Sequence, residues 1–222
     1  MNADTRTSVM LVDDHSIMRD LLRDALEETG EYRVVAQAAD GQEALRLAGE
    51  AVPDVVVMDV IMPVMDGIEA CREITGLLPD TKVLMLTASN EQDAIVRSIA
   101  AGATGYLQKY SGKEQLLATL REVAEGEFRI PGNAARRLAR AVRGPLGDAS
   151  AERLDSLTDR EVEILKLFAG GLSYQEIGDV REISALTVRN AVSGVQKKLG
   201  FRTRQQMVVW AIRAGVVDNG GE

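Results

Sequence analysis

The stretch "VVVMDVIMPVMDG" (55–67) sets a run of apolar side chains directly before an acid, Asp59, and places a second acid, Asp66, before Gly67. A short continuous apolar run is typical of a strand that is buried on both faces, as in a parallel sheet. An acid at the carboxyl end of such a strand belongs either to a phosphate or metal site or to a helix cap. The neighbouring segments decide between these alternatives.

Length and composition bound the class of protein. The chain has 222 residues, 45% apolar and 27% charged, which predicts a soluble globular protein of two domains. A net charge of −8 argues against uniform coating of nucleic acid but allows a local basic face. A single cysteine, Cys71, and a polar N-terminus without a long apolar run predict a cytoplasmic protein with no membrane segment.

The N-terminal half alternates apolar runs with segments of helical spacing. The predicted strands are residues 8–13, 32–38, 54–59, 82–88 and 104–109. The predicted helices are residues 15–30, 41–50, 65–76, 91–100 and 112–124. This alternation predicts an α/β doubly wound sheet of five parallel strands, whose site lies beyond the carboxyl ends of the strands.

Polar side chains stand where these strands end: Asp13, Asp14, Asp59, Thr87 and Lys109. One strand-end aspartate is most often a turn or a cap, but five such residues at one edge favour a shared site. Clustered carboxylates suit a hard divalent cation such as Mg²⁺. A hydroxyl and an ammonium group beside them suit the oxygens of a phosphoryl group.

Four motifs, "LVDDH" (11–15), "VVVMDVIMPVMDG" (55–67), "LTAS" (86–89) and "GYLQK" (105–109), resemble the CheY-like receiver domain of two-component response regulators. The resemblance covers about residues 8–125. It implies that Asp59 accepts a phosphoryl group from a sensor histidine kinase. The resemblance also implies that Mg²⁺ is bound by Asp13, Asp14, Asp59 and the Ile61 backbone carbonyl. It implies that Thr87 and Lys109 bind the phosphoryl oxygens and that Tyr106 is a switch side chain.

Three further residues near these motifs carry expectations. Many receivers have proline after the lysine, where this chain has Tyr110, so the geometry of that peptide bond stays open. His15, the one histidine, is expected to begin the first helix without transferring protons. Cys71 is expected in the core of the helix that follows the third strand.

The C-terminal half shows a change of character. We assign residues 1–125 to the receiver, 126–156 to a linker and 157–222 to a helical domain. In the linker, "GNAARRLARAVRG" (132–144) predicts a solvated helix rather than a DNA contact. Four helices are predicted after it, each opened by a capping side chain: Thr158, Ser173, Ser184 and Thr203.

The last helices predict a DNA-binding surface. No acid occurs between Glu182 and Asp218, although six basic residues do: Arg189, Lys197, Lys198, Arg202, Arg204 and Arg213. Residues 155–217 resemble the LuxR-type helix-turn-helix, so the whole chain resembles a NarL/FixJ-type response regulator. Arg181 departs from the leucine usual in that family and puts the packing of the second and third helices in doubt. The predicted contacts to double-stranded DNA are Thr187, Arg189, Asn190, Ser193, Lys197 and Lys198.

These expectations describe a transcription factor switched by phosphorylation, not an enzyme, that forms a homodimer when phosphorylated. The predicted dimer contacts are receiver surfaces near Tyr106 and the last helix, through Met207, Val208, Trp210 and Ala211. A phosphatase of the haloacid-dehalogenase type is an alternative, but "DDHS" (13–16) lacks a second acid two residues after the first. A regulator controlled without phosphate is disfavoured by the complete set of strand-end residues.

Overall fold

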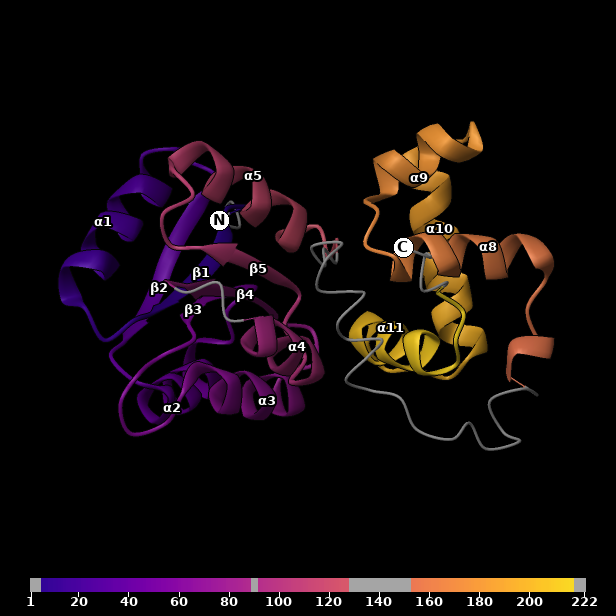
Figure 1. Ribbon diagram of the computed structural model, residues 1–222. Coiled ribbons are helices and arrows are strands. Elements are labelled where there is room, and N and C mark those ends of the chain that lie inside the picture. The colour runs from indigo at the N-terminus through magenta and orange to yellow at the C-terminus, as the bar shows by residue number, and fades with distance from the viewer. Residues whose placement is uncertain (1–4, 89–91, 128–152, 218–222) are drawn as a thin grey trace. The chain divides into compact units, whose positions relative to one another are not determined.

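The computed structural model describes residues 5–88, 92–127 and 153–217 (Figure 1). The chain divides into two compact units, Met1–Gly126 and Glu127–Glu222. The predicted helix at 132–144 lies outside the described residues.

The N-terminal unit is a five-stranded parallel sheet in the order β2-β1-β3-β4-β5, which confirms the predicted fold. Its strands are β1 (Thr7–Val12), β2 (Tyr32–Ala38), β3 (Val55–Asp59), β4 (Lys82–Thr87) and β5 (Gly105–Gln108). Its helices are α1 (Ser16–Glu27), α2 (Gly41–Ala51), α3 (Gly67–Leu77), α4 (Gln92–Ala100) and α5 (Lys113–Ala124). Helices cover both faces of the sheet (Figure 1).

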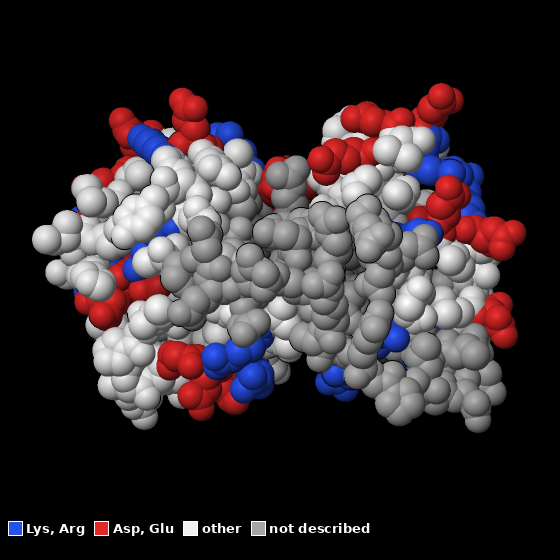
Figure 2. Space-filling model, viewed as in Figure 1, with Lys and Arg blue, Asp and Glu red and all other residues white. Residues whose placement is uncertain are grey.

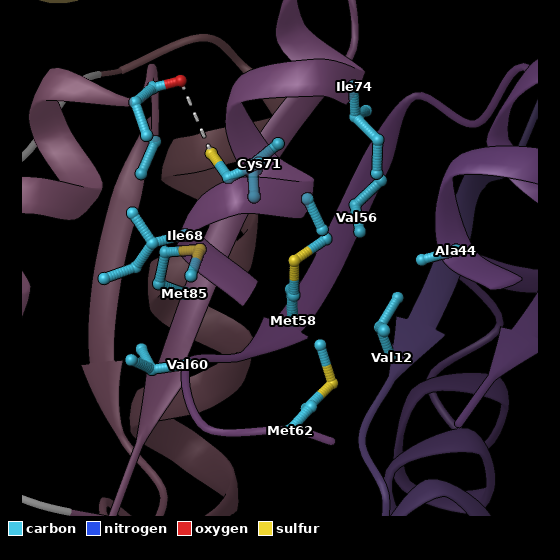
Figure 3. Packing of buried hydrophobic residues seen from close by; sticks show 14 of the residues in the cluster. Val12, Ala44, Val56, Met58, Val60, Met62, Ile68, Cys71, Ile74 and Met85 are labelled. Carbon is cyan, nitrogen blue, oxygen red and sulfur yellow. Dashed lines mark hydrogen bonds between the residues drawn. The ribbon is translucent and has the colours of Figure 1, made fainter. Parts of the chain in front are cut away.

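Side chains of β1, β3 and β4 alternate between two separate cores. Val9 and Leu11 of β1 pack in the cluster that holds α1 and α5, while Met10 and Val12 pack in the cluster that holds α2, α3 and α4. Cys71 lies inside the second cluster, where its Sγ contacts the Ala101 carbonyl oxygen at 3.8 Å (Figure 3). Burial raises the pKa of this thiol to about 12, so Cys71 is a core residue as predicted.

The order of the strands locates the crevice. β1 has β2 on one side and β3 on the other, so the chain reverses its direction of growth between β1 and β3. Ligand sites of open parallel sheets lie at this switch point, beyond the carboxyl ends of the strands. Asp13, the residue after β1, and Asp59, the last residue of β3, are both buried there.

The C-terminal unit contains α8 (Asp159–Ala169), α9 (Tyr174–Arg181), α10 (Ala185–Lys198) and α11 (Arg204–Arg213). All four predicted caps are confirmed: Thr158 and Ser173 form capping boxes, and the Ser184 and Thr203 side chains each accept a backbone N–H. Among the described residues, every helix of the chain is too short or too polar to cross a membrane.

The turn between α9 and α10 is tight, and a glycine permits it. A Cβ added at Gly178 would lie 2.6 Å from the Ile183 carbonyl oxygen, which only a residue without a side chain avoids. Ile177 of α9 and Val188 of α10 are fully buried. Arg181 does not disturb this packing, because its guanidinium reaches Glu163 of α8 at 2.5 Å.

Candidate functional site

Two buried acids and a lysine meet at the carboxyl edge of the sheet. Lys109, which follows β5, lies with its Nζ 2.8 Å from Asp13 Oδ2 and 2.6 Å from Asp59 Oδ2. All three side chains are less than a tenth exposed. The parallel sheet therefore joins residues that are far apart in the chain, since all strands end at the same edge.

The charges at this edge influence one another. The pKa of Asp59 is raised above its usual value, mainly because burial disfavours the carboxylate, although Lys109 opposes the shift. Burial lowers the pKa of Lys109, but hydrogen bonds and charge attraction to Asp13 and Asp59 outweigh it, so the net shift is upward. Asp13 Oδ2 is buried with Lys109 Nζ 2.8 Å away, and a carboxylate oxygen has a second lone pair that can accept a further partner.

Thr87, Tyr106 and Ile61 are the other residues predicted for this edge. Thr87 ends β4, is buried, and accepts the Lys109 backbone N–H on its carbonyl oxygen at 2.7 Å. Tyr106 lies half-buried in β5 against the cluster of α2, α3 and α4. Ile61 is 62% exposed, and its N–H points at Asp59 Oδ1 from 3.4 Å. The polar groups of the edge thus come from the ends of four strands, β1, β3, β4 and β5.

The second acid of the opening stretch is a helix cap. The Asp66 side chain accepts the Glu69 N–H at 2.8 Å and begins α3. Gly67 donates its N–H to the Val60 carbonyl oxygen at 3.0 Å, and a Cβ there would lie only 1.9 Å from the Asp59 carbonyl oxygen. Glycine is therefore required for α3 to start against the backbone of Asp59.

A group of possible metal ligands stands beside the crevice. Asp13, Asp14 and His15 each offer one atom, and these atoms lie within 4.8 Å of one another. His15 begins α1 as expected, yet its Nδ1 lies 2.7 Å from Asp14 Oδ1, a contact that no sequence pattern had indicated. Asp13 and Asp14 supply the carboxylate oxygens that Mg²⁺ prefers, and the second lone pair of the buried Asp13 Oδ2 can bind such an ion.

One face of α10 points away from its own unit. Val188, Val192 and Val195 are buried against the other helices. The opposite face carries the exposed side chains Leu186, Thr187, Asn190, Lys197 and Lys198. Charges of both signs lie side by side on the faces of the two units drawn in Figure 2. The face of α10 differs from them, because none of its exposed residues is acidic.

The model of the response regulator receiver domain matches residues 9–121, and that of the bacterial regulatory proteins of the luxR family matches residues 155–211. The chain belongs to the LuxR-type response regulators. Over 210 residues it is 36% identical to the transcriptional regulatory protein LiaR of Bacillus subtilis, covering 95% of this chain and 99% of that protein. It is 34% identical over 209 residues to VraR of Staphylococcus aureus, covering 94% and 98%.

Solved structures agree with this assignment. The regulator is similar to a LuxR-family two-component response regulator from Aurantimonas sp. SI85-9A1, with a TM-score of 0.56 and 35% identity over 61% of this chain and 97% of that one. It is also similar to the response regulator ChrA of a heme-sensing two-component system, with a TM-score of 0.51 and 30% identity over 96% of this chain and 100% of that one. The regulator therefore combines a receiver domain with a DNA-binding domain, as transcriptional response regulators do.

The structure separates the six predicted DNA contacts of the regulator. Asn190 and Lys197 are exposed, and Arg189 is half-buried at the flank of the face. The Thr187 hydroxyl shares a hydrogen bond of 2.8 Å with the Ser184 hydroxyl. The half-buried Ser193 accepts a hydrogen bond from Arg204 at 3.3 Å, and Lys198 pairs with Glu161 at 2.8 Å. Thr187, Ser193 and Lys198 thus each have a named partner within their own domain.

The structure also tests the predicted dimer contact and settles the peptide geometry that the sequence left open. Met207, Val208 and Ala211 are completely buried, so the prediction that these side chains make the dimer contact is wrong; they pack on the inner face of α11. Trp210 of the same helix stays half-exposed. The bond between Lys109 and Tyr110 is trans, since the described residues contain no cis peptide.

Proposed function

We propose that Asp59 is the phosphoacceptor of this regulator and that a sensor histidine kinase is the donor. The observation that carries the proposal is the bridge of Lys109 Nζ between Asp13 Oδ2 and Asp59 Oδ2, at 2.8 and 2.6 Å. An Asp59 oxygen bonds to phosphorus as the bond from phosphorus to the imidazole nitrogen of the kinase breaks. The product is an acyl phosphate on the regulator and a neutral histidine on the kinase.

The residues around Asp59 have separable roles in this transfer. Lys109 holds a positive charge beside the carboxylate and is positioned to pair with a phosphoryl oxygen once it is attached. Thr87 offers a hydroxyl from the end of the neighbouring strand. Tyr106, half-buried in β5, is the side chain that we expect to change rotamer when Thr87 moves toward the phosphate.

Mg²⁺ fits the donor set of this edge. The Asp13, Asp14 and Asp59 carboxylates and the Ile61 backbone carbonyl would hold the ion, which supplies positive charge that reduces repulsion between a carboxylate and a phosphoryl donor. The buried Asp13 carboxylate, which offers a ligand atom within 4.8 Å of those of Asp14 and His15, supports this assignment.

Phosphorylation controls DNA binding in this proposal. The exposed face of α10 enters the major groove of double-stranded DNA, with Thr187, Arg189, Asn190, Ser193, Lys197 and Lys198 at or beside the interface. One helix-turn-helix reads few base pairs, so we expect a phosphorylated homodimer on two-fold half-sites, within the cytoplasm where bacterial DNA lies.

Labelling with acetyl phosphate followed by intact mass measurement tests the phosphoacceptor. Wild type should gain about 80 Da, the mass of one phosphoryl group, only when Mg²⁺ is present. Asp59→Asn should gain nothing. Asp54→Asn is the matched control, because Asp54 precedes the opposite end of β3 and accepts hydrogen bonds from Ser8. An adduct on Asp59→Asn, or labelling that persists after chelation, would move the reaction to another site.

A further inference from the structure

Leu186 is a large apolar side chain at the front of α10, and it is 64% exposed. It is the second residue of the helix, after the Ser184 cap and Ala185. At ~100° per residue, Leu186, Asn190 and Lys197 fall within ~40° of one another around the helix axis. They lie nearly opposite the buried face of Val188 and Val192. Leu186 therefore lies in the first turn of α10, on the side of the helix that points away from the domain.

Leu186 keeps most of its side chain in solvent, so its burial contributes little to the packing of the domain. Exposed apolar residues scattered singly over a surface are ordinary, and Val180 of α9 is an example that is 61% exposed. Leu186 differs from Val180 because it shares its face with Asn190 and Lys197. Gly194, two turns further along α10, has no packing role either, since a Cβ added there would meet nothing within 4 Å. The exposed face of α10 therefore carries an apolar side chain in its first turn, at Leu186, and no side chain at Gly194.

The major groove offers one apolar group that fits such a side chain. Thymine presents its C5-methyl there, whereas adenine presents N7 and N6, which an asparagine binds with two hydrogen bonds. Residues i and i+4 of a helix are ~6 Å apart, which spans one to two base-pair steps of ~3.4 Å. Leu186 and Asn190 can therefore contact neighbouring or next-neighbouring base pairs at the same time.

We propose that Leu186 is a specificity-determining residue that contacts the C5-methyl of a thymine, one or two base pairs from the adenine bound by Asn190. This inference rests on the proposed entry of α10 into the major groove. It assigns the front of the reading face to an A·T-rich part of each half-site. The charged residues at its flank and end, Arg189 and Lys197, then contact the base pairs and phosphates beyond.

Selection from a randomised duplex library identifies the DNA sequence that the regulator prefers. The full-length protein, phosphorylated with acetyl phosphate, is used as wild type, Leu186→Ala and Val180→Ala. Each thymine of the site selected by wild type is then replaced by uracil, which keeps the base pair and removes only the methyl group. Thermal unfolding of each variant verifies that these exposed substitutions leave the fold intact.

The expected result is a difference between variants at one thymine of each half-site. Uracil at that position should lower the affinity of wild type and of Val180→Ala for the duplex about fourfold, which is the effect expected from losing one buried methyl group. The affinity of Leu186→Ala should not change. Leu186→Gln should lose the preference for thymine at the same position. Equal uracil effects on wild type and Leu186→Ala at every thymine would overturn the role of Leu186. Enrichment of no sequence by wild type would instead overturn the reading of DNA by α10.

Discussion

Replacing Gly67 by alanine should unfold the receiver domain at markedly lower urea concentration and slow its labelling at Asp59. The added Cβ would lie 1.9 Å from the Asp59 carbonyl oxygen, where ordinary van der Waals contact begins at 3.4 Å. The obstacle is the backbone of a buried strand, which cannot rotate away as a flexible side chain can. We therefore expect a loss of ~3 kcal/mol of unfolding free energy, the upper end for overpacked sites, and a fall in Tm of roughly 12 °C.

Gly76→Ala, in the same helix, is the matched control. A Cβ at Gly76 meets nothing within 4 Å, so alanine there should raise stability by ~0.5–1 kcal/mol through helix propensity. Circular dichroism follows the helices of both domains, while fluorescence of Trp210, the single tryptophan, follows the DNA-binding domain alone. A transition that circular dichroism detects and Trp210 fluorescence does not therefore belongs to the receiver. A Gly67→Ala protein that unfolds at the same urea concentration as wild type would refute the requirement for glycine beside Asp59.

Four further outcomes are expected. Arg189→Ala should reduce the binding free energy by ~1–3 kcal/mol on the selected duplex and by little on a scrambled duplex. Equal losses on the two duplexes in binding isotherms would show that Arg189 does not contact base edges. Lys197→Ala should weaken binding to both duplexes and reduce the salt slope by ~0.9, whereas Lys198→Ala should leave most of that slope unchanged. Lys198→Ala should instead lower the unfolding free energy of the DNA-binding domain by ~0.3–1 kcal/mol, and an unchanged urea midpoint of Trp210 fluorescence would contradict this. Contacts with Lys198 and Thr158 lower the pKa of Glu161 below 4.5. The stabilisation that these contacts give is therefore present above pH 4.5 and is lost as the pH falls below it. Glu161→Gln should make the unfolding free energy of the DNA-binding domain depend less on pH in this acidic range.

The fold followed from local patterns because each pattern had a physical cause. Apolar runs such as residues 55–58 need two covered faces, and the helical segments between them supply the cover. The carboxyl ends of parallel strands share an edge, so Asp13, Asp59 and Lys109 could be predicted to meet before any distance was known. The caps of the C-terminal helices were equally local, as Thr158 and Ser173 require only a glutamate three residues further on.

Contacts between elements were harder to predict, because sequence spacing does not determine which partner a long side chain reaches. Lys198 looked like a DNA contact beside Lys197, yet it reaches Glu161 on α8. His15 looked like a helix start alone, yet its ring turns back to Asp14. Met207 and Val208 suggested an apolar surface for dimerisation, although the same apolar character serves equally well for packing inside the domain.

These contacts change how the positive charge of the last helices is understood. The acid-free segment after Glu182 suggested one continuous basic stripe, but Lys198 is neutralised by Glu161, and the Arg204 guanidinium stacks over the Tyr174 ring with its centre 5.7 Å from the ring centroid. Fewer charges than the sequence contains are then available to bind phosphates, and each one removed should have a measurable effect on the salt slope. The middle of the α10 face is left to uncharged side chains. Discrimination between DNA sequences must therefore depend on apolar contacts and hydrogen bonds at the base edges more than on charge alone.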